Sequence, residues 1–139
     1  MKELRLMLSV LALILAASFA LSCGASSHGP GQLQTIMLNP ATADGQDYPK
    51  GVPFTATGYY IHPSYTVTPQ PATWGTCYQG APTSEVTVTT TGTAQCASGA
   101  TGNYTVFAYD VPNPSCESVS DACGGGGCTV VGTAQLTCP

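Results

Sequence analysis

The sequence predicts an exported all-β protein, an antiparallel β-sandwich of about seven strands that is cross-linked by disulfides and preceded by a signal peptide. Three observations predict it. Hydrophobic residues alternate with threonine and other polar residues in short runs. Glycine and proline, 16 and 11 of the 139 residues, separate those runs. Six of the seven cysteines lie between Cys77 and Cys138, far behind an apolar N-terminus.

Residues 1–22 have the pattern of a secretory signal peptide. Lys2 and Arg5 make the start basic, residues 6–21 carry no charge, and a small, polar, turn-forming stretch follows. The apolar run falls just short of the roughly 20 residues that span a bilayer. A cleaved signal is therefore favoured over an uncleaved anchor helix, which is the alternative.

Cys23 follows this leader directly and stands apart from the other six cysteines. The segment Ala20-Leu21-Ser22-Cys23 resembles the lipobox of bacterial lipoproteins, in which a small residue precedes an invariant cysteine. The resemblance implies cleavage before Cys23 and a lipid on its sulfur, although Ala20 stands where that family most often has leucine. The alternative is an ordinary signal cleaved nearby, which would leave a free thiol and a secreted protein.

Removing residues 1–22 leaves 117 of the 139, enough for a flexible tether at 23–34 and one domain at 35–139. This part has one basic residue, Lys50, and six acids: Asp44, Asp47, Glu85, Asp110, Glu117 and Asp121. A single lysine cannot neutralise a run of phosphates, so nucleic-acid binding is not expected. Binding to anionic lipid headgroups is not expected for the same reason, so membrane attachment would depend on the lipid on Cys23.

Alternating hydrophobic runs predict the individual strands. Ile36 and Leu38 share a face in a run that stops before Pro40, and the further runs lie at 54–60, 86–88, 104–109 and 134–138. No segment after residue 23 has a helical period. The sequences GTAQC (92–96) and GTAQLTC (132–138) echo each other, so each predicts a strand that delivers a cysteine to an end of the sandwich.

In order along the chain, these segments resemble the bacterial immunoglobulin-like domain, group 2. The matching segments are 36–40, 54–57, 67–74, 86–88, 92–94 and 102–108. The resemblance covers about residues 35–110 and implies a seven-stranded immunoglobulin-like sandwich with Trp74 in its core. It also implies a role in spacing, adhesion or contact with carbohydrates and surfaces, without family-wide catalytic residues. The six clustered cysteines and the long tail after residue 110 depart from the family pattern.

Six cysteines in an exported domain imply three disulfides, with 15 possible connectivities. The residues are Cys77, Cys96, Cys116, Cys123, Cys128 and Cys138. Alternating strand directions leave three cysteines at each end of the sandwich, so either the strand count is off by one or the long loop folds back along a sheet face. We favour the fold-back, and Cys77–Cys96 is the single bridge that we predict. Zinc binding by the last four cysteines is disfavoured because their spacing has no close pair and no histidine is near.

No group of residues has a catalytic signature, so neither an enzyme nor a cofactor or metal is predicted. His62 has no nameable partners as a base, and Asp44 and Asp47 are better explained by a turn than by a calcium loop. Lys50 is expected to be an exposed turn lysine rather than part of an isopeptide crosslink. Asn103 begins an Asn-x-Thr sequence, which is a glycosylation acceptor only in a suitable host.

Tyr59, Tyr65 and Tyr109 are predicted on open faces or loops, where they are possible ligand contacts. The sequence therefore favours a non-catalytic, lipid-anchored cell-envelope module, at the outer membrane or cell surface, with a structural, adhesive or protein-binding role. An accessory carbohydrate-binding domain is the alternative, and a small secreted hydrolase is the third. A continuous strip of exposed tyrosines would favour sugar binding, whereas a histidine or an acid pair in a deep cleft would favour an enzyme.

Overall fold

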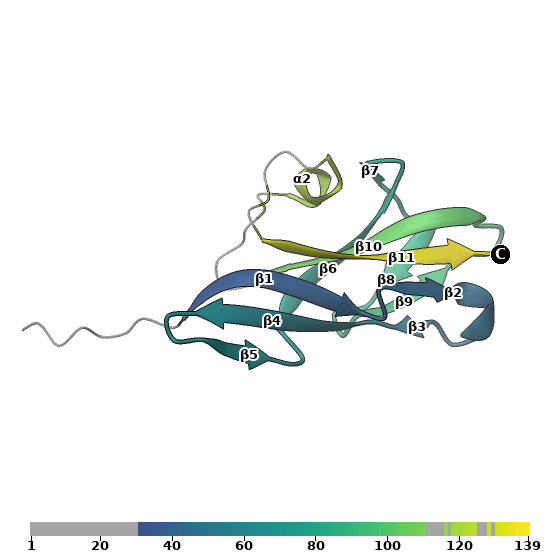
Figure 1. Ribbon diagram of the computed structural model, residues 1–139. Coiled ribbons are helices and arrows are strands. Elements are labelled where there is room, and N and C mark those ends of the chain that lie inside the picture. The colour runs from purple at the N-terminus through teal and green to yellow at the C-terminus, as the bar shows by residue number, and fades with distance from the viewer. Residues whose placement is uncertain (1–30, 111–115, 117, 125–127, 129) are drawn as a thin grey trace, which may run out of the picture.

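The protein is described by a computed structural model at residues 31–110, 116, 118–124, 128 and 130–139. Two layers of β-strands pack face to face, as the alternating pattern predicts (Figure 1). The strands are β1 (Gln32–Asn39), β2 (Thr42–Asp44), β3 (Val52–Pro53), β4 (Thr55–Ile61), β5 (Tyr65–Val67), β6 (Ala72–Tyr78), β7 (Ala81–Pro82), β8 (Val86–Val88), β9 (Thr93–Cys96), β10 (Gly102–Asp110) and β11 (Val131–Cys138).

The first layer consists of two short sheets placed end to end, ordered β1-β4-β5 and β3-β9-β8. They belong to one layer because β3 and β4 are nearly continuous, with Phe54 between them. The chain therefore pairs with β9 through Val52 and Pro53, and with β5 from Gly58 onward. Between those points the chain stays paired with β1 on one edge, but no strand pairs with its other edge, and we call this gap the break in the first layer.

The second layer is one five-stranded sheet, ordered β2-β11-β10-β6-β7. The chain leaves the first layer after Asn39 and enters the second at β2, which pairs in parallel with β11. The other pairings are antiparallel: β10 pairs with β11 from Gly102 to Tyr109, and with β6 from Thr105 to Asp110. Since β1 pairs with β4 while β2 pairs with β11, the N-terminal segment connects the two layers.

The described residues contain eleven strands rather than about seven. The extra ones arise because the first long run divides at the layer switch, because Phe54 interrupts another, and because β5 and β7 are short additions. The first strand begins at Gln32, so it takes in three residues expected in the tether.

Inward-facing residues of both layers form the core. From the first layer come Ile36, Leu38, Phe54 and Ala56, and from the second come Tyr104, Val106, Ala108, Ala134 and Leu136, each at most 6% exposed. These are the in-phase positions of the alternating runs, so the predicted strand faces are confirmed. Trp74, predicted in the core, is partly buried and packs against its rim.

Short edge strands limit pairing with other chains. Of the edge strands described, β2, β3, β5, β7 and β8 have two or three residues each, and β3 and β7 include Pro53 and Pro82, whereas β1 is a longer edge of eight residues. Natural sheets protect edges by shortness, proline or charge. Because charged residues make up 7% of this chain, shortness and proline carry most of that protection here.

A small second core lies on the outer face of the second layer. Phe107 and Tyr109 point outward from β10, yet they are 0% and 8% exposed, because they pack with Cys77 and Cys116 beneath the segment that carries α2 (Val119–Gly124). The prediction that Tyr109 is open is therefore wrong. The alternating pattern correctly places Tyr109 on the outer face of the sheet, but a segment distant in sequence covers that face.

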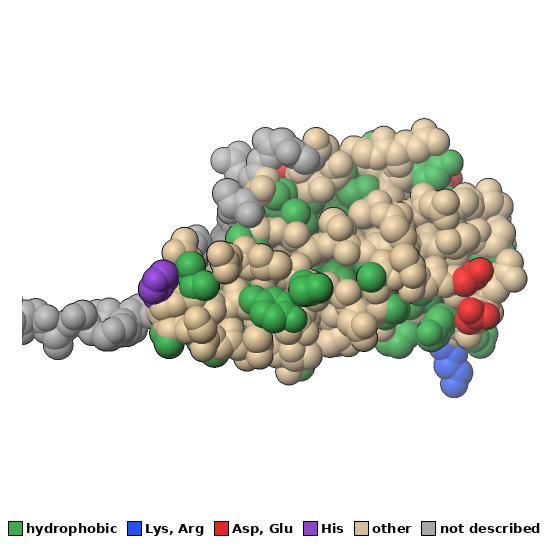
Figure 2. Space-filling model, viewed as in Figure 1, with side chains coloured by type: hydrophobic (Ala, Val, Ile, Leu, Met, Phe, Trp, Pro, Cys, Tyr) green, Lys and Arg blue, Asp and Glu red, His purple; other side chains and the backbone are tan. Residues whose placement is uncertain are grey.

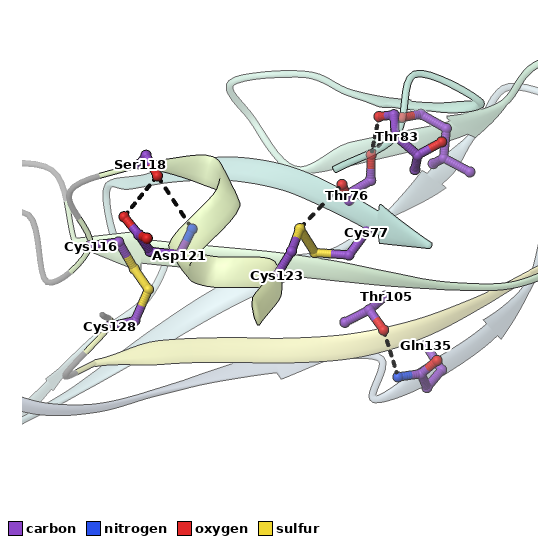
Figure 3. Close-up of a disulfide and its surroundings, with 11 residues drawn as sticks. Thr76, Cys77, Thr83, Thr105, Cys116, Ser118, Asp121, Cys123, Cys128 and Gln135 are labelled. Carbon is purple, nitrogen blue, oxygen red and sulfur yellow. Dashed lines mark hydrogen bonds between the residues drawn. A yellow bond between two sulfur atoms is a disulfide. The ribbon is translucent and has the colours of Figure 1, made fainter. Parts of the chain in front are cut away.

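Three disulfides pair the six cysteines: Cys77–Cys123, Cys96–Cys138 and Cys116–Cys128, with Cα–Cα distances of 5.6, 5.9 and 4.3 Å. Figure 3 shows the first and the third of these bridges. The favoured bridge Cys77–Cys96 is therefore wrong. The loop does fold back along the sheet, as expected, and brings Cys123 to Cys77 on β6. The two cysteines that end the echoed sequences, Cys96 and Cys138, pair with each other.

A short helix, α2, is the element that the sequence reading missed. Ser118 caps it: the Asp121 backbone N–H donates to Ser118 Oγ (3.3 Å), and the Ser118 hydroxyl donates to Asp121 Oδ2 (2.7 Å) (Figure 3). The sequence Ser118-x-x-Asp121 is a recognisable capping signal. It escaped notice because a six-residue helix has too few turns to show a hydrophobic period.

We predict that replacing Cys96 and Cys138 by alanine lowers the free energy of unfolding by about 2–4 kcal/mol. The Cys116–Cys128 pair closes a loop of 12 residues rather than 42, so removing it should cost about 1 kcal/mol less. Urea denaturation of both double variants measures this. Peptide mapping that found Cys96 joined to Cys77 would contradict the connectivity.

Replacing Gly75 by alanine should destabilise the domain by about 1–3 kcal/mol. Gly75 faces Phe107 across the β6–β10 ladder, and a Cβ there would collide with the buried Phe107 ring. Gly124→Ala, where a Cβ would meet nothing within 4 Å, is the matched control and should be neutral or slightly stabilising. Equal stability of the two variants in urea would argue against the Phe107 packing.

Candidate functional site

The predicted contact residues Tyr59 and Tyr65 are exposed, at 39% and 40%. They do not form one strip. Tyr59 and Tyr60 are neighbours in β4 and so point to opposite faces, and the Tyr65 ring stacks on Tyr60 with centroids 4.5 Å apart and planes at 4°. With Tyr109 buried, the three predicted tyrosines do not meet at one surface.

A buried hydrogen-bond chain supports the Tyr60–Tyr65 stack. The Tyr60 hydroxyl donates to Gln70 Oε1 (2.9 Å), and Gln70 Nε2 donates to the Pro71 carbonyl (3.2 Å) and to Asp110 Oδ1 (3.3 Å). Burial raises the pKa of Tyr60 above its ordinary value. Gln70 is 4% exposed and Asp110 is 7% exposed, so this chain links the two layers in the interior. These bonds connect β4 with β10 through Gln70.

A second buried tyrosine, Tyr104, is paired with a carboxylate. Its hydroxyl donates to Glu85 Oε2 at 2.5 Å, and its ring lies 4.9 Å from that of Tyr78. The hydrogen bond to Glu85 raises the pKa of Tyr104 to about 12, with burial contributing in the same direction. Tyr104 is therefore neutral at physiological pH and serves as a hydrogen-bond donor.

The break in the first layer opens onto Trp74. A cavity of about 230 Å³ lies there, and we call it the Trp74 slot. Trp74 lines it together with Pro69, Pro71, Thr55, Thr90 and Thr91. The sequence reading missed this site because it placed Trp74 wholly in the core. The sequence feature that indicates this site is the pair of prolines at 69 and 71, because proline prevents regular strand pairing beside the Trp74 ring.

A second depression, of about 260 Å³, lies beside the Cys96–Cys138 bridge. Its walls include Tyr48, Gly99 and the C-terminal residue Pro139. Tyr48 is 39% exposed and is the one aromatic side chain among its described lining residues. The ring of Tyr48 is less enclosed than that of Trp74, so this depression is the weaker candidate.

The residues considered for catalysis or metal binding stand apart from both cavities or have structural roles. His62 is exposed in a turn, with a backbone φ of 56°. Asp44 caps the short 3-10 helix at Gly45–Asp47, its Oδ1 accepting from the Gln46 N–H at 2.9 Å, which is the predicted turn role. Lys50 is exposed. Within the described ranges, no three His, Cys, Asp or Glu residues are grouped to hold a metal ion.

The face in Figure 2 is mostly uncharged, and its few acidic and basic side chains gather near one end. Cys23, the predicted lipid site, lies outside the described residues. Among the helices that the structure describes, none has the length and hydropathy needed to cross a membrane.

Comparison with known proteins gives no further assignment. No protein-family model matches the chain, and no curated protein matches it.

We predict that Glu85→Gln lowers the pKa of Tyr104 from about 12 toward the ordinary value of about 10. Because the folded pKa is the higher one, the stability linked to this proton is present below about pH 10 and is lost as pH rises to about 12. In the variant, that loss should occur at lower pH. Absorbance of the phenolate against pH measures the shift, with Tyr104→Phe as control. Because the pKa of Tyr60 is also raised, each titration is compared with that of the same protein carrying Tyr104→Phe. A Tyr104 that still titrates near 12 in Glu85→Gln would contradict this assignment.

Proposed function

We propose that this protein is a non-catalytic, immunoglobulin-like module held at the cell envelope by a lipid on Cys23, where it has a structural, adhesive or protein-binding role. One observation carries the proposal. The three disulfides use all six cysteines of the domain, so Cys23 has no cysteine of the domain left to pair with. A leader followed at once by such a cysteine is accounted for by lipidation. The three disulfides themselves indicate an oxidising, extracellular environment.

The order of strands supports the immunoglobulin-like part of the proposal. In spatial order across each layer, the main strands of the first layer are β1, β3–β4, β9 and β8, and those of the second are β11, β10 and β6. Immunoglobulin-like sandwiches have the corresponding arrangement, with strands A, B, E and D in one sheet and G, F and C in the other. The switch of the N-terminal segment from β1 to β2 allows it to pair with both layers.

The placement of the ends suits a tethered module. Strand β1 begins at the end of the sandwich that carries Tyr60 and Tyr65, whereas β11 ends at the opposite end, beside the Cys96–Cys138 bridge (Figure 1). An anchor upstream of β1 would therefore direct the Cys96–Cys138 end away from the membrane. The bridges also stabilise the domain against unfolding.

A second candidate function is carbohydrate binding, and the Trp74 slot favours it. A partly exposed tryptophan in an uncharged cavity suits a neutral ring more than it suits a structural contact. The same exported, disulfide-linked framework would serve either role.

Intact mass spectrometry of the purified exported protein tests the anchored module. We expect a chain that begins at Cys23 and carries a lipid-sized increment, and that gains six hydrogens on reduction of the three disulfides. Cys23→Ser is the control: it should lose the increment and leave the membrane fraction, while its three disulfides remain. A mature protein whose Cys23 thiol is alkylated without reduction would overturn the lipid anchor.

A further inference from the structure

The Trp74 slot exists because the first layer is interrupted. Along the edge of Phe54 to Ala56 two isolated backbone bonds take the place of a strand ladder: Phe54 N–H to the Gly92 carbonyl (2.9 Å) and Gln70 N–H to the Ala56 carbonyl (2.8 Å). No strand pairs with this edge of the chain, on the side opposite β1, so the Trp74 side chain from β6 lines a cavity here.

The indole ring is fixed before any ligand arrives. Gly92, with a backbone φ of +87°, lets the turn at 89–92 approach the ring so closely that a Cβ at this position would lie 2.8 Å from Trp74 Cζ2. Trp74 also lies opposite Ala108 in the β6–β10 ladder and packs against the core. A ring held in place by the turn and by the core loses little side-chain entropy on binding.

The chemistry of the lining selects an uncharged ligand. None of the described residues that line the slot is Asp, Glu, Lys, Arg or His. A charged group there would lose its hydration without gaining a partner. The lining combines an aromatic face with the hydroxyl-bearing residues Thr55, Thr90 and Thr91, so it offers both an apolar platform and hydrogen-bonding groups.

The size of the slot limits what can enter it. About 230 Å³ is less than the roughly 300–1,000 Å³ of a typical small-molecule pocket, so one ring unit fits rather than a whole extended ligand. A sugar ring matches the lining on both counts, since its apolar C–H face can stack on indole while its hydroxyls reach the threonines. A prolyl ring would use the aromatic face but leave the threonine hydroxyls unmatched.

We propose that the Trp74 slot binds one ring of a neutral polysaccharide, with the indole of Trp74 as the stacking platform and the threonines at its mouth as hydrogen-bonding groups. This inference deepens the carbohydrate-binding candidate and does not depend on the lipid on Cys23. The rest of the polysaccharide would extend from the slot across the uncharged surface around it.

Trp74 is the one tryptophan of the chain, so its fluorescence reports directly on the slot. The exported protein, kept in a detergent without a sugar headgroup, is titrated with neutral oligosaccharides of glucose, xylose and N-acetylglucosamine. An oligogalacturonate and a proline-rich peptide are titrated in parallel. We expect a saturable change in emission, and protection from acrylamide quenching, with at least one neutral oligosaccharide. No response to any of them, or a response to the peptide or the charged sugar alone, would overturn the proposal.

A blocking variant separates the slot from the stability of the fold. Thr90 is exposed, so Thr90→Trp adds bulk at the slot without removing a core contact. Calorimetry should show the oligosaccharide bound at least about tenfold more weakly, which corresponds to about 1.4 kcal/mol. Thr66→Trp, the same change at an exposed position outside the slot, should bind as the unmodified protein does. Equal affinity of the two variants would overturn the site. Since Cys23→Ser should leave binding unchanged, failure of the anchor and failure of the slot are distinguishable.

Discussion

The Cys77–Cys123 bridge determines what the outer face of the second layer can be. Without a cover, Phe107 and Tyr109 would present two aromatic rings to solvent from the centre of a sheet. The bridge holds α2 against β6, and the rings become part of a second small core. Both faces of strand β10 are therefore buried, whereas an antiparallel sheet commonly leaves one of its faces to solvent. The Cys116–Cys128 bridge stabilises the same covering segment.

The scarcity of charge explains how the rest of the molecule is held together. With 7% charged residues, the domain has few ion pairs to form, and its buried polar groups instead bond to one another. The Tyr60–Gln70–Asp110 chain and the Tyr104–Glu85 pair are examples. Among the described residues, every buried side-chain nitrogen and oxygen has a hydrogen-bond partner. The energetic cost of burying polar groups is thereby offset by hydrogen bonds rather than by ion pairs.

The Trp74 slot results from the positions of a few prolines and one glycine around the indole ring. Prolines at 69 and 71 prevent a regular strand from running beside Phe54, and Gly92 allows a turn to press against the indole from the other side. The result is a rigid aromatic surface in an otherwise featureless, threonine-rich sandwich. In a protein with 7% charged residues, such a surface suits the recognition that we propose, because aromatic contact needs no counter-charge.

The sequence by itself determined the properties that depend on neighbours along the chain. Period-two alternation determined the strands and the face on which Tyr104, Val106 and Leu136 lie, and the cysteine count determined three disulfides. Tertiary structure alone decided which cysteines pair, that Tyr109 is covered, and that Trp74 lines a cavity. These outcomes depend on segments distant in sequence: α2 meets β6 across 46 residues, and the turn at 89–92 meets Trp74. The alternating pattern predicts to which face of its strand a side chain points. Whether that side chain is buried depends on which distant segment packs on that face, and no local sequence pattern encodes this.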